Sequence, residues 1–259
     1  MTRPLPSLAA LFGAALLASC GANAVQDITG PLPSARVRFF NFGVNAPAVN
    51  FYAGGAKMTA VQSTTGTEST NGVSYGGTGA NNSGLYSGIA PGQYDLTGRI
   101  AAATDKDLVI AKVSATIADG KYYSFYMSGF YDPVAKTVEA FVVEDPISAA
   151  FDYTQAYVRF VNAISNANAM TLYAKNTATG TEVPIGAAVA YKAAGAFTAV
   201  PAAVYDLSTR FAGSAANAIA RTGVSFVAGR VYTITARGDI TVTSTTATNR
   251  PFLDNTANR

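Results

Sequence analysis

Apolar and polar residues alternate along much of the chain, and this pattern predicts short β-strands. Between residues 94 and 100, Leu96 and Ile100 alternate with Asp95 and Arg99, which is the period of two that a half-buried strand shows. Glycine and proline residues separate such stretches and limit their length. Roughly seven strands in about 110 residues are typical of a β-sandwich. We therefore expect an all-β fold.

Three further segments refine this expectation. Residues 109–117 and 122–128 flank the pair Asp119-Gly120, and an Asp-Gly pair supplies the positive φ that a tight hairpin turn needs. We therefore expect these two segments to pair as a hairpin. The alanine-rich segments 187–194 and 212–220 are expected to form a helical turn at most, because their surroundings are strand-like.

The body of the chain contains an internal sequence repeat with two similar copies. Several short motifs recur in the same order more than 100 positions later: Ala35–Asn41 as Ala156–Asn162, Tyr94–Arg99 as Tyr205–Arg210, and Gly120–Ser124 as Gly229–Thr233. Such self-similarity is the signature of a duplicated structural unit. The sequence predicts two tandem β-sandwich domains, at 35–146 and 155–255, joined near Pro146.

The amino terminus carries the features of an export signal. A basic residue, Arg3, precedes an apolar run over residues 8–18. Eleven residues are too few to cross a bilayer of about 30 Å as a helix, so the run is typical of a signal peptide rather than of a membrane span.

The end of this run, Leu17-Ala18-Ser19-Cys20, resembles the lipobox of bacterial lipoproteins. The only cysteine of the chain stands at the position that this motif requires. The resemblance implies a signal peptide over 1–19, a diacylglycerol and an N-acyl lipid on Cys20, and a tether over 20–34. Gly21 rather than aspartate follows the cysteine, which favours the outer membrane. The alternative is an ordinary signal peptide with an incidental cysteine.

The repeated segments also resemble a known family. The stretches that carry the resemblance are Val44–Tyr52, Pro91–Tyr94 and Ala228–Thr233. They are similar to the bacterial domain of unknown function 4397, which occurs in exported and lipid-anchored proteins, often in tandem. The resemblance implies an immunoglobulin-like or transthyretin-like β-sandwich and brings no mechanism. Asn45 and Asn50 stand where the family often has aspartate, which weakens a carboxylate-based role there.

Composition excludes several classes of activity. The chain has no histidine and one cysteine, so it lacks the parts of a Ser-His-Asp or Cys-His centre and of a thiolate zinc site. Its 18 basic and 15 acidic residues give a net charge of +3, which is too balanced for a nucleic-acid binder. Asp105-Lys106-Asp107 lacks the further ligands of a calcium loop. We expect no metal and no cofactor beyond the lipid on Cys20.

Repeated charged residues predict structural ion pairs. In residues 36–42 the arginines share the face opposite to Val37 and Phe39. We expect surface pairs between Asp95 and either Arg38 or Arg99, and the repeat then pairs Asp206 with either Arg159 or Arg210. The alternative is a carboxylate-dependent hydrolase, for example on glycans, in which two of Asp95, Asp206 or Glu144-Asp145 face each other across a cleft.

Positions that differ between the two copies are the better candidates for binding. The first copy has about ten extra residues within Gln62–Gly84, and it has Tyr122 and Tyr126 where the second has Val231 and Thr235, with Tyr131 close behind. Alternation assigns Tyr122 and Tyr126 to the outer face, where tyrosines can contact a sugar or a protein. The alternatives are packing between the domains and a tolerated loop insertion.

Together these features predict a lipid-anchored envelope protein that serves as a non-catalytic binding, adhesion or scaffold module. Its expected partners are the membrane, through the anchor, and envelope proteins or glycans. A hydrolase and a purely structural spacer are the alternatives.

Overall fold

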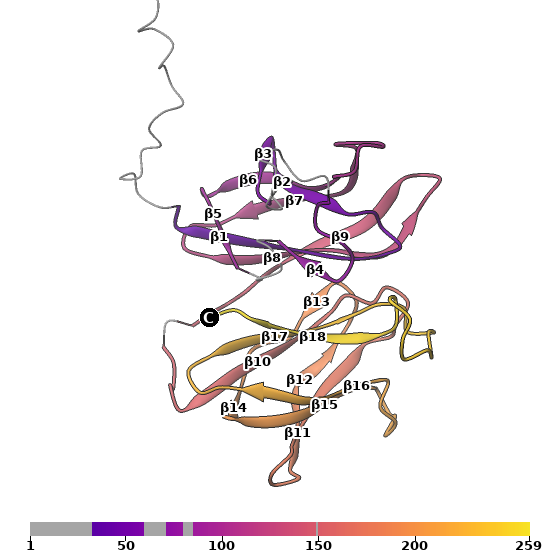
Figure 1. The fold of residues 1–259 in the computed structure, drawn as a ribbon. Helices are drawn as coiled ribbons and strands as arrows, with labels where there is room; N and C mark the ends of the chain where they lie inside the picture. The colour runs from indigo at the N-terminus through magenta and orange to yellow at the C-terminus, as the bar shows by residue number, and fades with distance from the viewer. Residues whose placement is uncertain (1–32, 60–70, 80–84, 149) are drawn as a thin grey trace, which may run out of the picture. The chain divides into compact units, whose positions relative to one another are not determined.

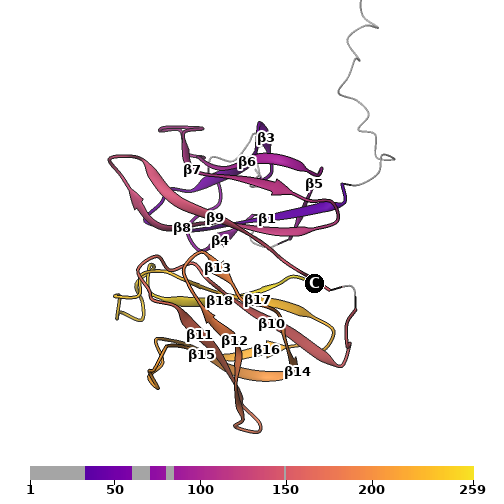
Figure 2. The ribbon, with the colours of Figure 1, turned by 180° about the vertical axis from the view of Figure 1, so that it is seen from behind.

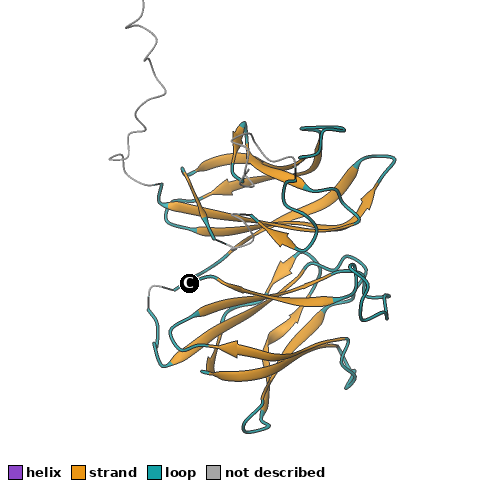
Figure 3. Cartoon of the chain, in the orientation of Figure 1, coloured by secondary structure: helices purple, strands orange, loops and turns teal. Residues whose placement is uncertain are grey.

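Every regular element in the part of the chain that the structure describes is a β-strand (Figures 1 and 3). The computed structural model describes residues 33–59, 71–79, 85–148 and 150–259. These residues form 18 strands in four sheets. The predicted all-β fold is confirmed. The two alanine-rich segments lie in strands and turns, so the helical turn allowed for them is absent from these described residues.

The first half of the described chain contains two sheets. One has the order β4-β1-β8-β9, with β5 also paired to β1, and the other has the order β3-β2-β6-β7. The strands are β1 (Ala35–Val44), β2 (Val49–Ala53), β3 (Ala56–Lys57), β4 (Gly77–Thr78), β5 (Ser87–Ile89), β6 (Gly92–Ile100), β7 (Val109–Ile117), β8 (Tyr122–Asp132) and β9 (Thr137–Glu144).

The second half repeats this arrangement strand for strand. Its sheets have the orders β13-β10-β17-β18, with β14 also paired to β10, and β12-β11-β15-β16. The strands are β10 (Gln155–Asn162), β11 (Met170–Asn176), β12 (Glu182–Val189), β13 (Ala193–Ala194), β14 (Thr198–Pro201), β15 (Ala203–Phe211), β16 (Ile219–Phe226), β17 (Val231–Arg237) and β18 (Phe252–Ala257). β1 pairs with β8 in parallel and β10 pairs with β17 in parallel, so even the one unusual pairing recurs (Figure 2).

A buried asparagine near the end of the first strand in each half ties that strand to a neighbouring segment. The Asn41 amide nitrogen donates to the carbonyl of Val73 at 2.8 Å, and the Asn162 amide nitrogen donates to the carbonyl of Val189 at 3.3 Å. Both side chains are fully buried, where an unpaired amide would be costly. The repeated sequence therefore encodes repeated contacts as well as repeated strands.

The predicted hairpin across Asp119-Gly120 is wrong. β7 pairs with β6 and β8 pairs with β1 and β9, so the two strands belong to different sheets. Gly120 does have the positive φ of 66° that a tight turn needs. The turn carries the chain from one sheet to the other rather than back along the same sheet.

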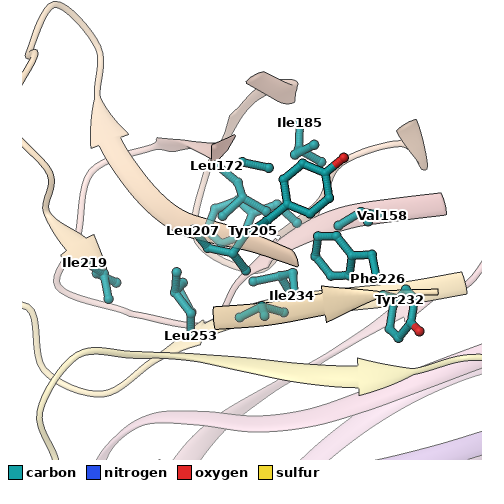
Figure 4. Close-up of a cluster of buried hydrophobic side chains, with 14 of the residues drawn as sticks. Val158, Leu172, Ile185, Tyr205, Leu207, Ile219, Phe226, Tyr232, Ile234 and Leu253 are labelled. Carbon is teal, nitrogen blue, oxygen red and sulfur yellow. The ribbon is translucent and has the colours of Figure 1, made fainter. Parts of the chain in front are cut away.

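Each half has its own hydrophobic core between its two sheets. In the first half the Phe39 ring stacks on the Phe51 ring, with the ring centres 5.1 Å apart, and its centre lies 5.8 Å from that of the Phe125 ring. Figure 4 shows the second core, where Tyr205 and Phe226 from one sheet meet residues such as Val158 and Ile234 from the other.

A third buried cluster joins the two halves. It contains Phe40, Phe42, Tyr126 and Phe141 from the first half with Val161 and Ala163 from the second. The sheets that contain β1 and β10 are therefore covered on both faces, which explains why these strands are almost continuously buried. β9 ends at Glu144, β10 begins at Gln155, and residues 33–259 form one compact unit. The predicted division into domains at 35–146 and 155–255 stays a prediction.

Phe125→Ala should lower the free energy of unfolding by about 3–5 kcal/mol, because it opens a cavity at a fully buried site in the first core. Val134, at 92% exposure, provides the control. Val134→Ala should change stability by less than about 0.5 kcal/mol. Urea unfolding of the two variants measures the difference, and equal midpoints would contradict this description of the core.

Candidate functional site

The most concentrated polar chemistry of the described chain is a buried cluster between the two halves. It consists of Arg38, Ser124, Asp145, Arg159 and Thr233, and we call it the Asp145 cluster. Arg38 and Asp145 are 1% exposed, and Arg159 is fully buried. Charged side chains at such depth require partners that replace the water they have lost.

The carboxylate of Asp145 is the centre of this cluster. Its Oδ1 pairs with Arg159 Nη2. Its Oδ2 accepts hydrogen bonds from Ser124 Oγ, at 2.7 Å, and from the hydroxyl of Tyr86, and lies 3.7 Å from Arg38 Nε. Both carboxylate oxygens are thus engaged with cations or hydroxyl donors, and the residue has a structural role.

The second half contains the same chain of contacts with one change. Arg38 Nε donates to Ser124 Oγ at 2.8 Å, and Arg159 Nε donates to Thr233 Oγ1 at 3.1 Å. Ser124 donates to Asp145, whereas Thr233 donates to Asn258 Oδ1 at 2.8 Å. Asn258 follows β18 as Asp145 follows β9. An amide in the second half therefore occupies the place of the carboxylate in the first.

The two halves contact each other through a pseudo-two-fold arrangement. Arg159 Nη1 donates to the carbonyl of Glu144 at 2.9 Å, and Arg38 Nη1 donates to the carbonyl of Ala257 at 3.3 Å. Glu144 and Ala257 are equivalent, because they pair with Tyr123 and Tyr232 at the same register. Each arginine therefore reaches the last strand of the opposite half, as in the self-complementary interface of a two-fold dimer.

Contacts at the edge of this interface are related by the same pseudo-two-fold symmetry. The Tyr191 hydroxyl lies 3.0 Å from Ser128 Oγ, and the Arg237 guanidinium lies 5.0 Å from the centre of the Tyr75 ring. Tyr75 and Tyr191 precede equivalent short strands, and Ser128 and Arg237 occupy equivalent positions on β8 and β17. The correspondence therefore extends beyond the Asp145 cluster.

Burial raises the pKa of the Tyr86 hydroxyl far above its ordinary value of 10.0, against the opposing effect of Arg38, and the charge of Asp145 raises it further. The hydroxyl is therefore neutral at physiological pH and remains a donor to Asp145. Arg38 lies over the Tyr86 ring, 4.7 Å from its centre, and Arg159 lies 4.8 Å from the centre of the Phe197 ring. These contacts stabilise guanidinium groups that have little water around them.

The predicted ion pairs of the first half are wrong. Asp95 pairs with Lys112 at 2.7 Å and accepts from Ser114 at 2.5 Å, both on the neighbouring strand β7. Arg99 instead lies over the Tyr52 ring at 4.3 Å. Arg38 is buried rather than on a surface. The pair with Arg38 fails because Asp95 belongs to the sheet that does not contain β1. The pair with Arg99 fails because Arg99 lies four residues further along the same strand, about 13 Å away, so cross-strand neighbours are the nearest partners of Asp95.

The corresponding pairs of the second half are also wrong. Arg210 pairs with Glu182 at 2.8 Å and lies over the Tyr173 ring at 4.4 Å. Asp206 accepts from the backbone nitrogen of Gly223 at 3.0 Å. Arg159 is committed to Asp145. Only the stacking of an arginine on a tyrosine from the adjacent strand is common to Arg99 and Arg210.

The predicted ligand-binding tyrosines are separated by the fold. Tyr126 is fully buried in the cluster between the halves, stacked on Phe40 at 4.6 Å, so its assignment to the outer surface is wrong. The opposite half covers the face that alternation assigned to solvent. Tyr122 is half-buried with its edge against Tyr86, and half-buried Tyr131 packs against the first core.

Other predicted features lie outside the described residues. These are the signal peptide 1–19, Cys20, the tether up to residue 32, and residues 62–70 and 80–84 of the insertion. Of the acidic motifs, Asp105 is paired with Lys136 at 2.7 Å. Among the described residues there is no group of three or more acidic, histidine or cysteine side chains placed to hold a metal ion.

Sequence reasoning missed the residues that matter most at this interface. The sequence pattern points to Asp145 only as half of the pair Glu144-Asp145 and does not point to Asn258 or Tyr86. One signal does point to Asp145, since Arg38 and Arg159 recur within strands that are otherwise apolar. Buried arginines require a carboxylate, and Asp145 is an acidic residue that closes the last strand of one half.

Asp145→Asn should lower the free energy of unfolding by about 3–5 kcal/mol, because it leaves two buried guanidinium groups without a carboxylate. The pseudo-two-fold relation predicts that adding Asn258→Asp restores a large part of this loss by moving the carboxylate to the equivalent position. Urea unfolding measures both variants. Asp95→Asn, at an exposed pair, is the control and should leave the midpoint unchanged. A double variant that is less stable than Asp145→Asn alone would refute the equivalence.

Tyr126→Phe should leave stability at pH 7 unchanged or increase it, because the buried Tyr126 hydroxyl lies near Thr235 without forming a hydrogen bond of good geometry. Burial raises the pKa of this hydroxyl above 10.0. The folded protein therefore retains a proton that the unfolded chain loses, and stability falls as the pH rises above about 10. Thermal unfolding between pH 8 and 11 should show a shallower decline for the variant. An equal decline would show that Tyr126 does not contribute.

Comparison with known proteins identifies a family. No curated protein matches the chain. In the described residues no helix is both long enough and apolar enough to span a membrane. The model of a domain of unknown function, DUF4397, matches residues 35–173, which cover the first half and the first two strands of the second up to Tyr173. The chain therefore belongs to the DUF4397 family.

Proposed function

We propose that the protein is a lipid-anchored cell-envelope protein whose paired β-sandwiches form a non-catalytic binding or scaffold module. The observation that carries the anchor is the position of the single cysteine, Cys20, directly after an apolar run and the residues Leu17-Ala18-Ser19. Export and a lipid on Cys20 follow from this motif, and Gly21 rather than aspartate after the cysteine favours the outer membrane. The second half, which repeats the pairing of the first, would then be a further copy of the same family.

The use of the charged side chains supports a non-catalytic role. Asp145 is saturated by two arginines, a serine and a tyrosine. Asp95 and Asp206 belong to β6 and β15, which lie in the outer sheet of each half, with the two joined sheets between them. A hydrolase of the two-carboxylate type needs carboxyl groups about 5–10 Å apart across a cleft. This separation favours binding over that chemistry.

A surface on the first half supports binding rather than a purely structural spacer. Leu85 is 65% exposed, and the adjacent Tyr86 meets Tyr122 edge-on at 5.2 Å. Aromatic residues beside exposed apolar ones are common at recognition surfaces. Tyr122 therefore remains a candidate contact residue, with envelope proteins or glycans as partners. Tyr126 is buried and cannot contact them.

Cys20→Ala should abolish attachment to the membrane while leaving the folded part intact, because lipid chains rather than the sandwiches provide the anchor. Detergent phase partitioning and membrane fractionation measure the effect. Ser19→Ala, which keeps a small residue before the cysteine, is the matched control and should remain attached. A Cys20→Ala protein that still fractionates with membranes would exclude the lipid anchor.

A further inference from the structure

A cavity of about 270 Å³ lies beside the connection between the two halves. We call it the Phe197 pocket. Its walls include Pro146, Ile147 and Phe151 from the connection and Tyr157, Phe197 and Val231 from the second half. These side chains are mainly apolar and three of them are aromatic, as is usual for small-molecule sites.

The equivalent position in the first half shows which kind of group fits beside Phe197. Tyr86 is the equivalent of Phe197, because the next residues, Ser87 and Thr198, pair with Val37 and Val158 at the same register. Both rings also carry the repeated arginine contact, at 4.7 and 4.8 Å. The surroundings of the two rings can therefore be compared directly.

In the first half an aromatic ring packs against Tyr86. Tyr122 lies opposite Arg36 on β1, and its ring meets the Tyr86 ring at 5.2 Å with an interplanar angle of 84°. At the equivalent place in the second half Val231 lies opposite Tyr157. Valine has no ring to place against Phe197, and the Phe197 pocket lies at this position.

The described walls of the Phe197 pocket contain no charged side chain and two hydroxyl groups, those of Ser148 and Tyr157, which favours a neutral occupant. The Tyr157 hydroxyl already accepts a hydrogen bond from the backbone nitrogen of Asp152 at 3.0 Å, and the Arg259 guanidinium lies 4.8 Å from the centre of the Phe151 ring. An apolar cavity of about 150 Å³ is enough to hold benzene. The Phe197 pocket therefore has room for one ring with a small substituent.

We propose that the Phe197 pocket binds a small neutral aromatic molecule whose ring packs against Phe197 as Tyr122 packs against Tyr86. The second half thus obtains from a ligand the aromatic contact that the first half makes with its own side chain. This proposal does not depend on the lipid anchor or on a partner at Tyr122.

Binding of 4-fluorophenol, followed by fluorine NMR, tests the proposal. The protein used begins at Gly21 and keeps the whole compact unit 33–259. We expect a dissociation constant on the order of 1 mM, as suits a ligand of this size. Unlabelled p-cresol should displace the probe and cyclohexanol should not. Failure of the probe to bind, or equal displacement by cyclohexanol, would overturn the proposal.

Val231→Tyr locates the site, because it supplies the ring that the first half carries at this position. The variant should weaken binding at least tenfold. Val204→Tyr, at a valine of β15 with 43% exposure, is the matched control and should bind as the unchanged protein does. Ile147→Trp fills the pocket from the connection and should weaken binding equally if Val231→Tyr does not fold. Unchanged binding in a folded pocket variant would place the probe elsewhere and refute the assignment.

Discussion

The interaction between one carboxylate and two arginines organises the contact between the halves of this protein. Arg38 and Arg159 enter from equivalent strands, and Asp145, at the end of β9, is the acidic residue that meets both. Its pairing with Arg159 holds the end of β9 of the first half against β10 of the second. The aromatic cluster around Phe40 and Tyr126 then excludes water from the same interface, which strengthens the electrostatic attraction. Polar and apolar contacts therefore support one another here.

Much of the fold could be predicted because its determinants are local and repeated. Alternation predicted strands, roughly seven in each copy, whereas the described residues form nine in each half, and internal similarity predicted that the two halves share one arrangement. The hairpin at Asp119-Gly120 was mispredicted because turn chemistry specifies a change of direction and not the sheet that the next strand joins. β8 pairs instead with β1 through residues far away in sequence.

The site was harder to predict because alternation reports which residues differ in polarity and not which face meets another sheet. Tyr126 was assigned to solvent on this basis, yet the second half covers it. The same reasoning placed Arg38 and Arg159 at the surface. Tyr126, Arg38 and Arg159 are buried because the two halves, which are far apart in sequence, pack against each other. The Phe197 pocket could not be inferred either, since it depends on the path of the connection after Asp145.

The replacement of a carboxylate by Asn258 in the second half has a consequence for pairing between different chains. Two second halves brought together in this geometry would bury two arginines with two amides, which is strongly unfavourable. Two first halves would bury matched charges. The geometry therefore disfavours pairing between two second halves, and we expect an exchange of halves between molecules to pair each second half with a first half.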